Sequence, residues 1–274
     1  MQISRKDVQK MKSRLRWVYL LMVSLGIDLR KTINAVGGIP HFFHDLHTLR
    51  KQSVSSDMLF PLVVLYPCIE DRFSESGTAK GHYFHQDLLV AQRIYSNKPI
   101  IHVDIGSCIE GFVAHVASYR RIEVIDIRPL SINIKNIKFS QIDIVADLQD
   151  NLLNYCDSLS CLHALEHFGL GRYGDRVNFN GHIDGLNNIY KILQKNGKFY
   201  FSAPIGPQRI EFNAHRVFSL KYLIEIFQGK FSIDYFAYVD DRGNLHENVM
   251  LSEKNISNNY DCNYGCGIFE MTKI

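Results

Sequence analysis

The chain has 274 residues, of which 46% are hydrophobic and 22% are charged, and its net charge at neutral pH is +3. These values are ordinary for a globular protein and exclude a chain that is disordered throughout. The net charge is also too small to predict a nucleic-acid partner, and the length suits one large α/β domain with an appended segment.

Positive charge is concentrated in residues 1–52, which contain ten Lys or Arg and three acidic residues. The apolar segment 17–27 follows four basic residues, but it is shorter than the ~20 residues that a membrane-spanning helix needs. It also lacks the cleavage site of a signal peptide. Two interpretations stay open: a basic interfacial helix at the inner face of a membrane, or a helix packed on its own domain or a second subunit. The Gly-Gly-Ile-Pro segment 37–40 is expected to separate two helical stretches.

The composition changes along the chain predict three parts. Residues 1–52 are expected to form a helical extension, residues 53–83 a linker and lid-like segment, and residues 84–274 the main α/β domain. The linker is indicated by a polar run at 52–57 and a loop rich in Ser and Gly at 74–81.

From residue 84 onward, strand patterns alternate with helix patterns. The expected helices are Phe84–Tyr95, Gly111–Tyr119, His182–Leu193 and Ser219–Phe227. The expected strands are Ile100–Asp104, Ile122–Ile127, Ile137–Ile142, Ser158–His163, Lys198–Ala203, Phe231–Val239 and Gly267–Thr272. This alternation predicts a mainly parallel sheet covered on both faces. The last two strands have no clear helix between them, which predicts a hairpin at one sheet edge.

The turn after the first strand contains the most informative residues. Asp104 ends the strand, and Gly106 lets the backbone approach a ligand beyond the strand's carboxyl end. The dinucleotide pattern Gly-x-Gly-x-x-Gly is absent, because Gly106 and Gly111 are five apart and Cys108 is not glycine. A carboxylate here would repel a pyrophosphate, which disfavours NAD. It suits a ligand with a positive amine, such as the amino-acid end of S-adenosylmethionine.

The next two predicted strands are also followed by acids. Asp126 stands where a carboxylate can accept both ribose hydroxyls, and Asp143 could lie beside an adenine amine. Each acid alone could be a turn former or a helix cap. Acids after three successive strands together favour a nucleoside site. The predicted cofactor-binding residues are Asp104, Gly106, Ser107, Gly111, Asp126, Ile127, Asp143 and His163.

In these motifs the chain resembles the class I S-adenosylmethionine-dependent methyltransferase superfamily, over roughly residues 84–272. The resemblance implies a Rossmann-like, seven-stranded, mostly parallel sheet with an antiparallel last strand, and S-adenosylmethionine as cofactor. The departure from the family pattern is Cys108, which stands where the second glycine is usual, with Gly111 one place late. The segments that carry the resemblance are Asp104–Gly106, Asp126, Ser160–His167 and Ile192–Lys198.

A closer resemblance is to a family of unknown function, DUF268. That family is often associated with bacterial surface-polysaccharide synthesis, so the resemblance implies a cytoplasmic enzyme that O-methylates a sugar or polysaccharide precursor. The alternative, favoured by Cys108, is a catalytically degenerate module that binds a sugar nucleotide or a partner protein. The matching segments are Tyr83–Asp87, His163–Asp175, Phe212–Phe218 and Tyr238–Glu247.

Methyl transfer requires an aligned acceptor and removal of its proton. His167 is the first choice of base, since histidine titrates near neutral pH, and Glu166 and His215 are the other catalytic candidates. The alternative for His167 is a ring that caps the turn after the fourth strand.

The predicted acceptor-binding residues are Arg216, Arg172 and His85. Arg216 would hold an anionic acceptor by a bidentate contact, or else form a surface ion pair. Arg172 lies in a Gly-rich loop suited to a lid, and His85 is expected to close over the site.

No metal site is predicted. His163 and His167 have the spacing of a helical ligand pair, but they are expected at a strand end and in a loop. The six scattered cysteines are typical of cytosolic thiols, and the pair Cys262 and Cys266 lacks the second half of a zinc site.

Overall fold

The computed structural model describes residues 17–54, 64–74, 76–77 and 79–274. The chain forms two compact units, residues 1–77 and residues 78–274, and each is described by itself. The basic residues at positions 10–16 and residues 55–63, 75 and 78 of the predicted linker lie outside the described residues. The division into extension, linker and main domain therefore stays a prediction.

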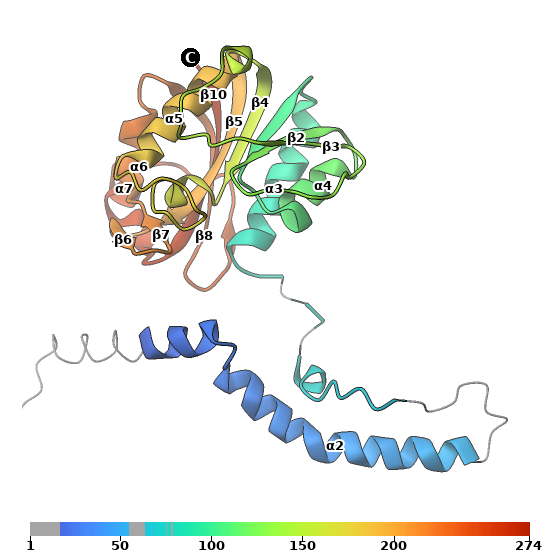
Figure 1. The fold of residues 1–274 in the computed structure, drawn as a ribbon. Helices are drawn as coiled ribbons and strands as arrows, with labels where there is room; N and C mark the ends of the chain where they lie inside the picture. The colour runs from blue at the N-terminus through green and yellow to red at the C-terminus, as the bar shows by residue number, and fades with distance from the viewer. Residues whose placement is uncertain (1–16, 55–63, 75, 78) are drawn as a thin grey trace, which may run out of the picture. The chain divides into compact units, whose positions relative to one another are not determined.

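The N-terminal unit contains a helical segment at 17–24 and the helix α2, Leu29–Val54 (Figure 1). The predicted break at 37–40 is wrong, because α2 runs through this segment with Pro40 inside it. The helical stretches separate instead near Gly26, whose left-handed backbone (φ +86°) ends a helix without steric cost. Gly38 has a packing role: a Cβ there would lie 1.8 Å from the carbonyl oxygen of Ile69.

Large apolar side chains are exposed along this unit, including Trp17, Leu25, Ile33 and Phe43. Among the described residues, no helix is long and apolar enough to cross a membrane. Contact of residues 1–52 with a lipid surface stays a prediction.

The second unit is built on one eight-stranded sheet, ordered β3-β2-β1-β4-β5-β10-β8-β9. Its first five strands in this order are parallel, and β10 pairs antiparallel with both β5 and β8. The strands are β1 His102–Ile105, β2 Ile122–Asp126, β3 Ile137–Gln141, β4 Cys156–Leu162, β5 Leu193–Ile205, β8 Phe231–Val239, β9 Leu245–His246 and β10 Gly265–Lys273. The predicted Rossmann-like, mostly parallel sheet with an antiparallel last strand is confirmed.

Two details of the sheet differ from the prediction. The sheet has eight strands where seven were predicted, because the short strand β9 pairs with β8 at the edge, beyond the predicted antiparallel pair of β8 and β10. A short helix, α7 (Glu253–Asn258), lies between β8 and β10, and the two-residue β9 is too short to give a sequence pattern. A separate pair of strands, β6 (Arg209–Glu211) and β7 (His215–Val217), follows β5.

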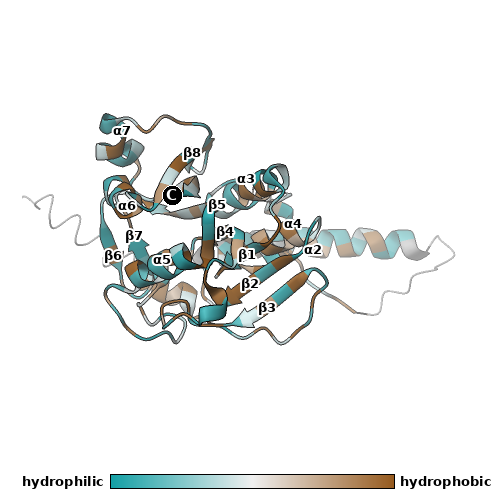
Figure 2. Cartoon of the chain, turned by 90° about the horizontal axis from the view of Figure 1, so that it is seen from above, coloured by the Kyte–Doolittle hydropathy of each residue, from teal (hydrophilic) through white to brown (hydrophobic). Residues whose placement is uncertain are grey.

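Helices cover both faces of this sheet (Figures 1 and 2). The apolar sides of α3 and α4 pack on one face with Val124, Tyr200 and Ile268, and those of α5 and α6 pack on the other with Leu159, Phe201 and Phe269. Alternate strand residues thus enter two different cores, as the two-residue period of a strand requires. The helices are α3 His82–Asn97, α4 Ala114–Ala117, α5 Gly181–Ile192 and α6 Leu220–Phe227, and η2 Ile109–Val113 precedes α4.

The position of β10 inside the core can be tested through Phe269, which is 1% exposed and packs on Phe236 and Phe227 with ring centroids 4.8 and 5.6 Å away. We expect Phe269→Ala to lower the free energy of unfolding by about 3–5 kcal/mol, because it opens a cavity. Phe179→Ala, at a side chain that is 74% exposed, is the control and should change it by less than about 0.5 kcal/mol. Urea unfolding followed by far-ultraviolet circular dichroism measures both, and equal effects would contradict an interior β10.

Candidate functional site

The loop after β1 is held by the buried carboxylate of Asp104. One oxygen accepts hydrogen bonds from the hydroxyls of Ser107 (2.7 Å) and Ser160 (2.6 Å), and the other accepts from the Ser107 amide (3.1 Å). Burial raises the pKa of Asp104 to about 6, although these hydrogen bonds oppose the rise. Asp104 and Ser107 therefore shape the turn and tie it to β4, and neither lines the adjacent pocket.

A buried histidine extends this polar network between β1 and β4. His102 contacts the Ser160 hydroxyl through Nε2 (3.1 Å) and the Ser158 hydroxyl through Nδ1 (2.7 Å). Since Ser160 gives its single proton to Asp104, Nε2 of His102 donates to Ser160, and Nδ1 accepts from Ser158. Burial lowers the pKa of His102 to about 3, so the ring is neutral. Sequence reasoning missed this network, although the alternation of polar residues along two predicted strands is a signal that indicates it.

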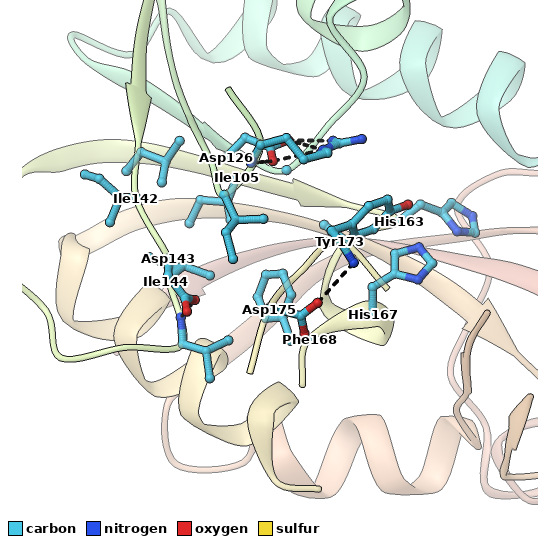
Figure 3. A pocket seen from close by; sticks show the side chains of 16 residues that line it. Ile105, Asp126, Ile142, Asp143, Ile144, His163, His167, Phe168, Tyr173 and Asp175 are labelled. Carbon is cyan, nitrogen blue, oxygen red and sulfur yellow. Dashed lines mark hydrogen bonds and ion pairs between the residues drawn. The ribbon is translucent and has the colours of Figure 1, made fainter. Parts of the chain in front are cut away.

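A pocket opens beyond the carboxyl ends of β1, β2 and β3 (Figure 3). It is a partly open hollow between these strand ends and the loop after β4. Six of the predicted site residues line it: Gly106, Asp126, Ile127, Asp143, His163 and His167. Gly106 has a left-handed backbone (φ +76°), and a Cβ there would lie 2.9 Å from the Cβ of Ala164. A side chain at this position would therefore force the turn away from β4.

Asp126 lies at the pocket in an ion pair with Arg128. The guanidinium contacts both carboxylate oxygens, with Nη2 2.5 Å from Oδ2 and Nε 3.0 Å from Oδ1, and it also lies over the Tyr173 ring. Its side chain is 45% exposed, whereas that of Asp126 is 10% exposed. Arg128 can therefore swing into solvent when a ligand needs the carboxylate. Sequence reasoning missed Arg128 and Tyr173, because neither belongs to a strand-end motif.

The walls of the pocket are mainly apolar. Ile105, Ile127, Ile142 and Phe168 surround a space suited to a flat ring, and Asp143 lies at its rim, where one carboxylate oxygen accepts a hydrogen bond from the Val145 amide (2.9 Å). An apolar slot with acids at its edges can bind a nucleoside by stacking and by hydrogen bonds to its polar groups.

A buried acid and two histidines follow β4. Glu166 is 1% exposed, and one of its oxygens lies 2.8 Å from Nδ1 of His163 and 3.9 Å from Nε2 of His167. Burial by itself would raise the pKa of Glu166, but the charge of His163 and their hydrogen bond lower it. Burial would lower the pKa of His163, but Cys266 and Glu166 together raise it. His163 also has a left-handed backbone (φ +49°), a strained geometry that is common at functional sites in non-glycine residues.

His167 has the geometry of a base. Its Nδ1 lies 2.7 Å from the carbonyl oxygen of Ala214 and must donate to it, so the Nε2 lone pair is left available. Burial lowers the pKa of His167, which keeps the ring neutral at pH 7. Arg172 donates to the same carbonyl (3.1 Å), which places it beside the base. The ring of His215 is 6.2 Å from that of His167, and its Nε2 lies 3.7 Å from Glu211.

Besides Asp104 and Ser107, six predicted site residues do not line the pocket, and three of these six, Arg216, His85 and Gly111, have structural contacts elsewhere. Arg216 is buried, and its guanidinium donates to the carbonyl oxygens of Phe168 (2.7 Å), Phe179 (3.0 Å) and Glu166 (3.2 Å). It therefore holds the loop after β4 from inside and is not turned toward an acceptor. His85 donates to the Gly243 carbonyl (3.2 Å). Gly111 makes room for α3, since a Cβ there would lie 2.7 Å from Asp87.

The burial of Asp104 predicts a pH dependence of stability. Because its pKa is raised from 3.8 to about 6, the native state binds this proton more tightly than the unfolded chain does, so its contribution to stability falls as the pH rises from about 4 to about 6. We expect the free energy of unfolding of wild type minus that of Asp104→Asn to be larger at pH 4 than at pH 7. Urea unfolding at each pH measures this difference. Ser160→Ala removes a hydrogen bond that lowers the pKa of Asp104, so in that variant the fall in stability should extend to higher pH. A difference that is constant over this range would contradict the buried carboxylate.

Comparison with known proteins gives a family and a fold. The family described as "Caenorhabditis protein of unknown function, DUF268" matches residues 109–263, more than half of the chain. No curated protein matches the sequence. The [4+2]-cyclase SpnF is similar in structure, with a TM-score of 0.50 and 14% identity over 69% of this chain and 80% of SpnF.

Two solved methyltransferases are similar at lower scores. The N-methyltransferase NodS from Bradyrhizobium japonicum WM9, in complex with S-adenosyl-L-homocysteine, gives a TM-score of 0.47 and 12% identity over 70% of this chain and 88% of NodS. The 1,6-didemethyltoxoflavin-N1-methyltransferase from Burkholderia thailandensis, with bound 1,6-didemethyltoxoflavin and S-adenosylhomocysteine, gives a TM-score of 0.48 and 14% identity over 69% of this chain and 78% of that enzyme.

Proposed function

The chain belongs to the DUF268 family, and from that premise and the geometry of the site we propose that it is an S-adenosylmethionine-dependent methyltransferase. The observation that carries the proposal is one juxtaposition. An apolar pocket with Asp126 and Asp143 at its rim is lined at one end by His167, a neutral histidine whose Nε2 is available. Solved methyltransferases of similar fold hold S-adenosylhomocysteine, which agrees with this cofactor class.

The residues at the pocket fit the nucleoside half of this cofactor. Asp126 would accept the two ribose hydroxyls once Arg128 moves away, and the slot between Ile127, Ile142 and Phe168 would take the adenine ring. Gly106, which has no side chain, would let the rest of the molecule pass close to the β1 turn. The bound cofactor supplies an electrophilic methyl group, and the protein supplies alignment and a base.

The proton of the acceptor would go to His167. Its Nε2 is unprotonated at neutral pH, since burial lowers the pKa, and the hydrogen bond to Ala214 fixes the ring in the orientation that a base requires. Glu166 lies behind both His163 and His167 and would stabilise the imidazolium that forms. His215 does not line the pocket, but its ring lies 6.2 Å from that of His167, and it would contact the acceptor there.

The acceptor that we propose is a hydroxyl of a sugar or of a cytoplasmic polysaccharide precursor. Tyr83, Tyr264 and Tyr173 lie next to His163, His215 and His167, with ring centroids 5.0–5.5 Å apart. Tyrosine offers an apolar face and a hydroxyl together, which suits a pyranose ring that has one apolar and several polar edges. Arg172, beside the base, would bind an attached phosphate or carboxylate.

One observation favours a second candidate, a non-catalytic module of the same fold. Arg128 neutralises Asp126 in the structure, and Cys108 stands where the methyltransferase pattern has a glycine. If this ion pair is permanent, the ribose site is closed and the pocket would serve another ligand.

Cofactor binding tests the first part of the proposal. We expect wild type to bind S-adenosylhomocysteine in a calorimetric titration and Asp126→Asn to bind it about tenfold to a hundredfold more weakly, because a charged acceptor of two hydroxyl protons is lost. Asp150→Asn, an exposed aspartate outside the pocket, is the matched control and should bind like wild type. Absence of binding to folded wild type would support the non-catalytic module.

Methyl transfer tests the second part. With radiolabelled S-adenosylmethionine and a panel of UDP- and GDP-linked hexoses and uronic acids, we expect label in at least one sugar. His167→Gln should lower kcat by about 10²–10⁴-fold and leave cofactor affinity unchanged. The wild-type rate should fall as the pH drops below the lowered pKa of His167, and this acidic limb should vanish in the variant. His182→Gln, at a buried histidine bonded to Tyr222 away from the pocket, is the control. A normal rate for His167→Gln would exclude it as the base.

A further inference from the structure

Three potential metal ligands from distant parts of the chain meet beside the histidines of the site. His82 begins α3, His163 follows β4, and Cys266 lies on β10. One ligand atom of each lies within 4.8 Å of the other two. The sequence spacing paired His163 with His167 and Cys266 with Cys262, but the fold brings together one member of each pair. Cys262 instead donates its thiol proton toward the Tyr260 carbonyl oxygen (3.7 Å).

The His163 ring has the surroundings of a metal ligand, with a carboxylate on one nitrogen and the other nitrogen buried. Its side chain is 4% exposed, and Nδ1 lies 2.8 Å from Glu166. Nε2 is buried and makes no hydrogen bond of normal geometry in the part of the chain that the structure describes, although the Cys266 thiol lies close enough to interact with the ring. A buried polar atom without a partner is costly, so such an atom indicates a missing ligand. A carboxylate that holds one nitrogen of a histidine while the other binds the cation is the usual outer contact of a metal site.

The other two ligands are also positioned. The His82 ring has the backbone of Tyr264 as a hydrogen-bonding partner and stacks on the His163 ring, with centroids 5.2 Å apart and an interplanar angle of 16°. Cys266 is fully buried on β10, which pairs with a strand on each side. The strained left-handed backbone of His163 turns the chain just where its ring joins this group. One ligand is thus fixed by the sheet, one by Glu166 and one by the start of a helix.

We propose that His82, His163 and Cys266 bind a divalent cation of the zinc type, with a fourth position open. Two imidazoles and one thiolate are a donor set that Zn²⁺ prefers, and three protein ligands with an open position are typical of catalytic zinc. Tetrahedral ligands lie about 3.4–3.6 Å apart, so the distances between the ligand atoms, all within 4.8 Å, must shorten by at most about 1 Å on binding. His82 can supply this movement, because it is the first residue of α3 and follows Gly81, whose backbone is left-handed (φ +87°).

The three ligands lie next to the pocket, so a cation bound to them could take part in the reaction. His163 also lines the nucleoside pocket, so a cation on its ring would lie at the boundary between that pocket and the tyrosines proposed for the acceptor. A hydroxyl bound at the open position would lose its proton more readily, and His167, which shares Glu166 with His163, would be the candidate to accept that proton. The metal site itself does not depend on the proposed methyl transfer and is tested without it.

The test is a titration of the metal-stripped full chain with Co²⁺, followed by displacement with Zn²⁺. We expect one Co²⁺ per chain, with the near-ultraviolet charge-transfer band of a thiolate ligand and the visible bands of a tetrahedral site. Cys266→Ser should remove the charge-transfer band, and His82→Ala should weaken binding by about a hundredfold or more. Glu166→Gln should weaken it by about tenfold to a hundredfold, because it loses the outer contact.

Cys262→Ser and His182→Gln are the matched controls, since both remove a buried residue of the same type outside the group. Both should keep the wild-type affinity and spectrum, and circular dichroism checks that each variant is folded. His82 is only partly buried, so its variant tests the site even where Cys266→Ser fails to fold. A cobalt spectrum without a thiolate band in wild type, or equal losses in Cys262→Ser and Cys266→Ser, would overturn the proposal, as would no binding of either metal by wild type.

Discussion

The Asp104 carboxylate is buried where β1 meets β4, and the ligand-binding edge of the sheet depends on the hydrogen bonds that compensate for this burial. These bonds join the turn after β1 to Ser160, and Ser160 is joined through His102 to Ser158. The turn is thereby held close to β4, at a separation that only a glycine at position 106 permits. The pocket beyond β1, β2 and β3 exists because this turn stays in place.

The loop after β4 is fixed by a second set of buried polar contacts. The buried guanidinium of Arg216 donates hydrogen bonds to three backbone carbonyl oxygens of this loop. Glu166 contacts His163 and lies near His167. The two histidines therefore have different chemistry in one small volume. His163 is tied to a carboxylate and directs its other nitrogen elsewhere, whereas His167 is held by a neutral carbonyl and keeps a free lone pair. The two histidines differ because the partner of His163, Glu166, is a charged carboxylate, whereas the partner of His167, the Ala214 carbonyl, is neutral.

Much of the fold was predictable, because local patterns determine it. Apolar periodicity located the helices and strands that cover and form the sheet, and the acids after β2 and β3, Asp126 and Asp143, located the pocket edge. The directions of individual side chains were not predictable. Asp104 and Arg216 both point into the protein, because their hydrogen-bond partners lie on β4 and on the loop after it. The position of β10 inside the sheet depends on long-range pairing with β5 and β8. Cys266 lies near His82 and His163 because β10 pairs in this way, and no local sequence pattern predicts this proximity.

We propose that the pocket beyond β1 to β3 binds the nucleoside of S-adenosylmethionine. A crystal structure of the protein grown with S-adenosylhomocysteine tests it most directly. We expect adenine between Ile142 and Phe168, ribose hydroxyls on Asp126, and the Arg128 guanidinium displaced from that carboxylate. An unaltered ion pair between Asp126 and Arg128, with the ligand absent or bound elsewhere, would contradict it.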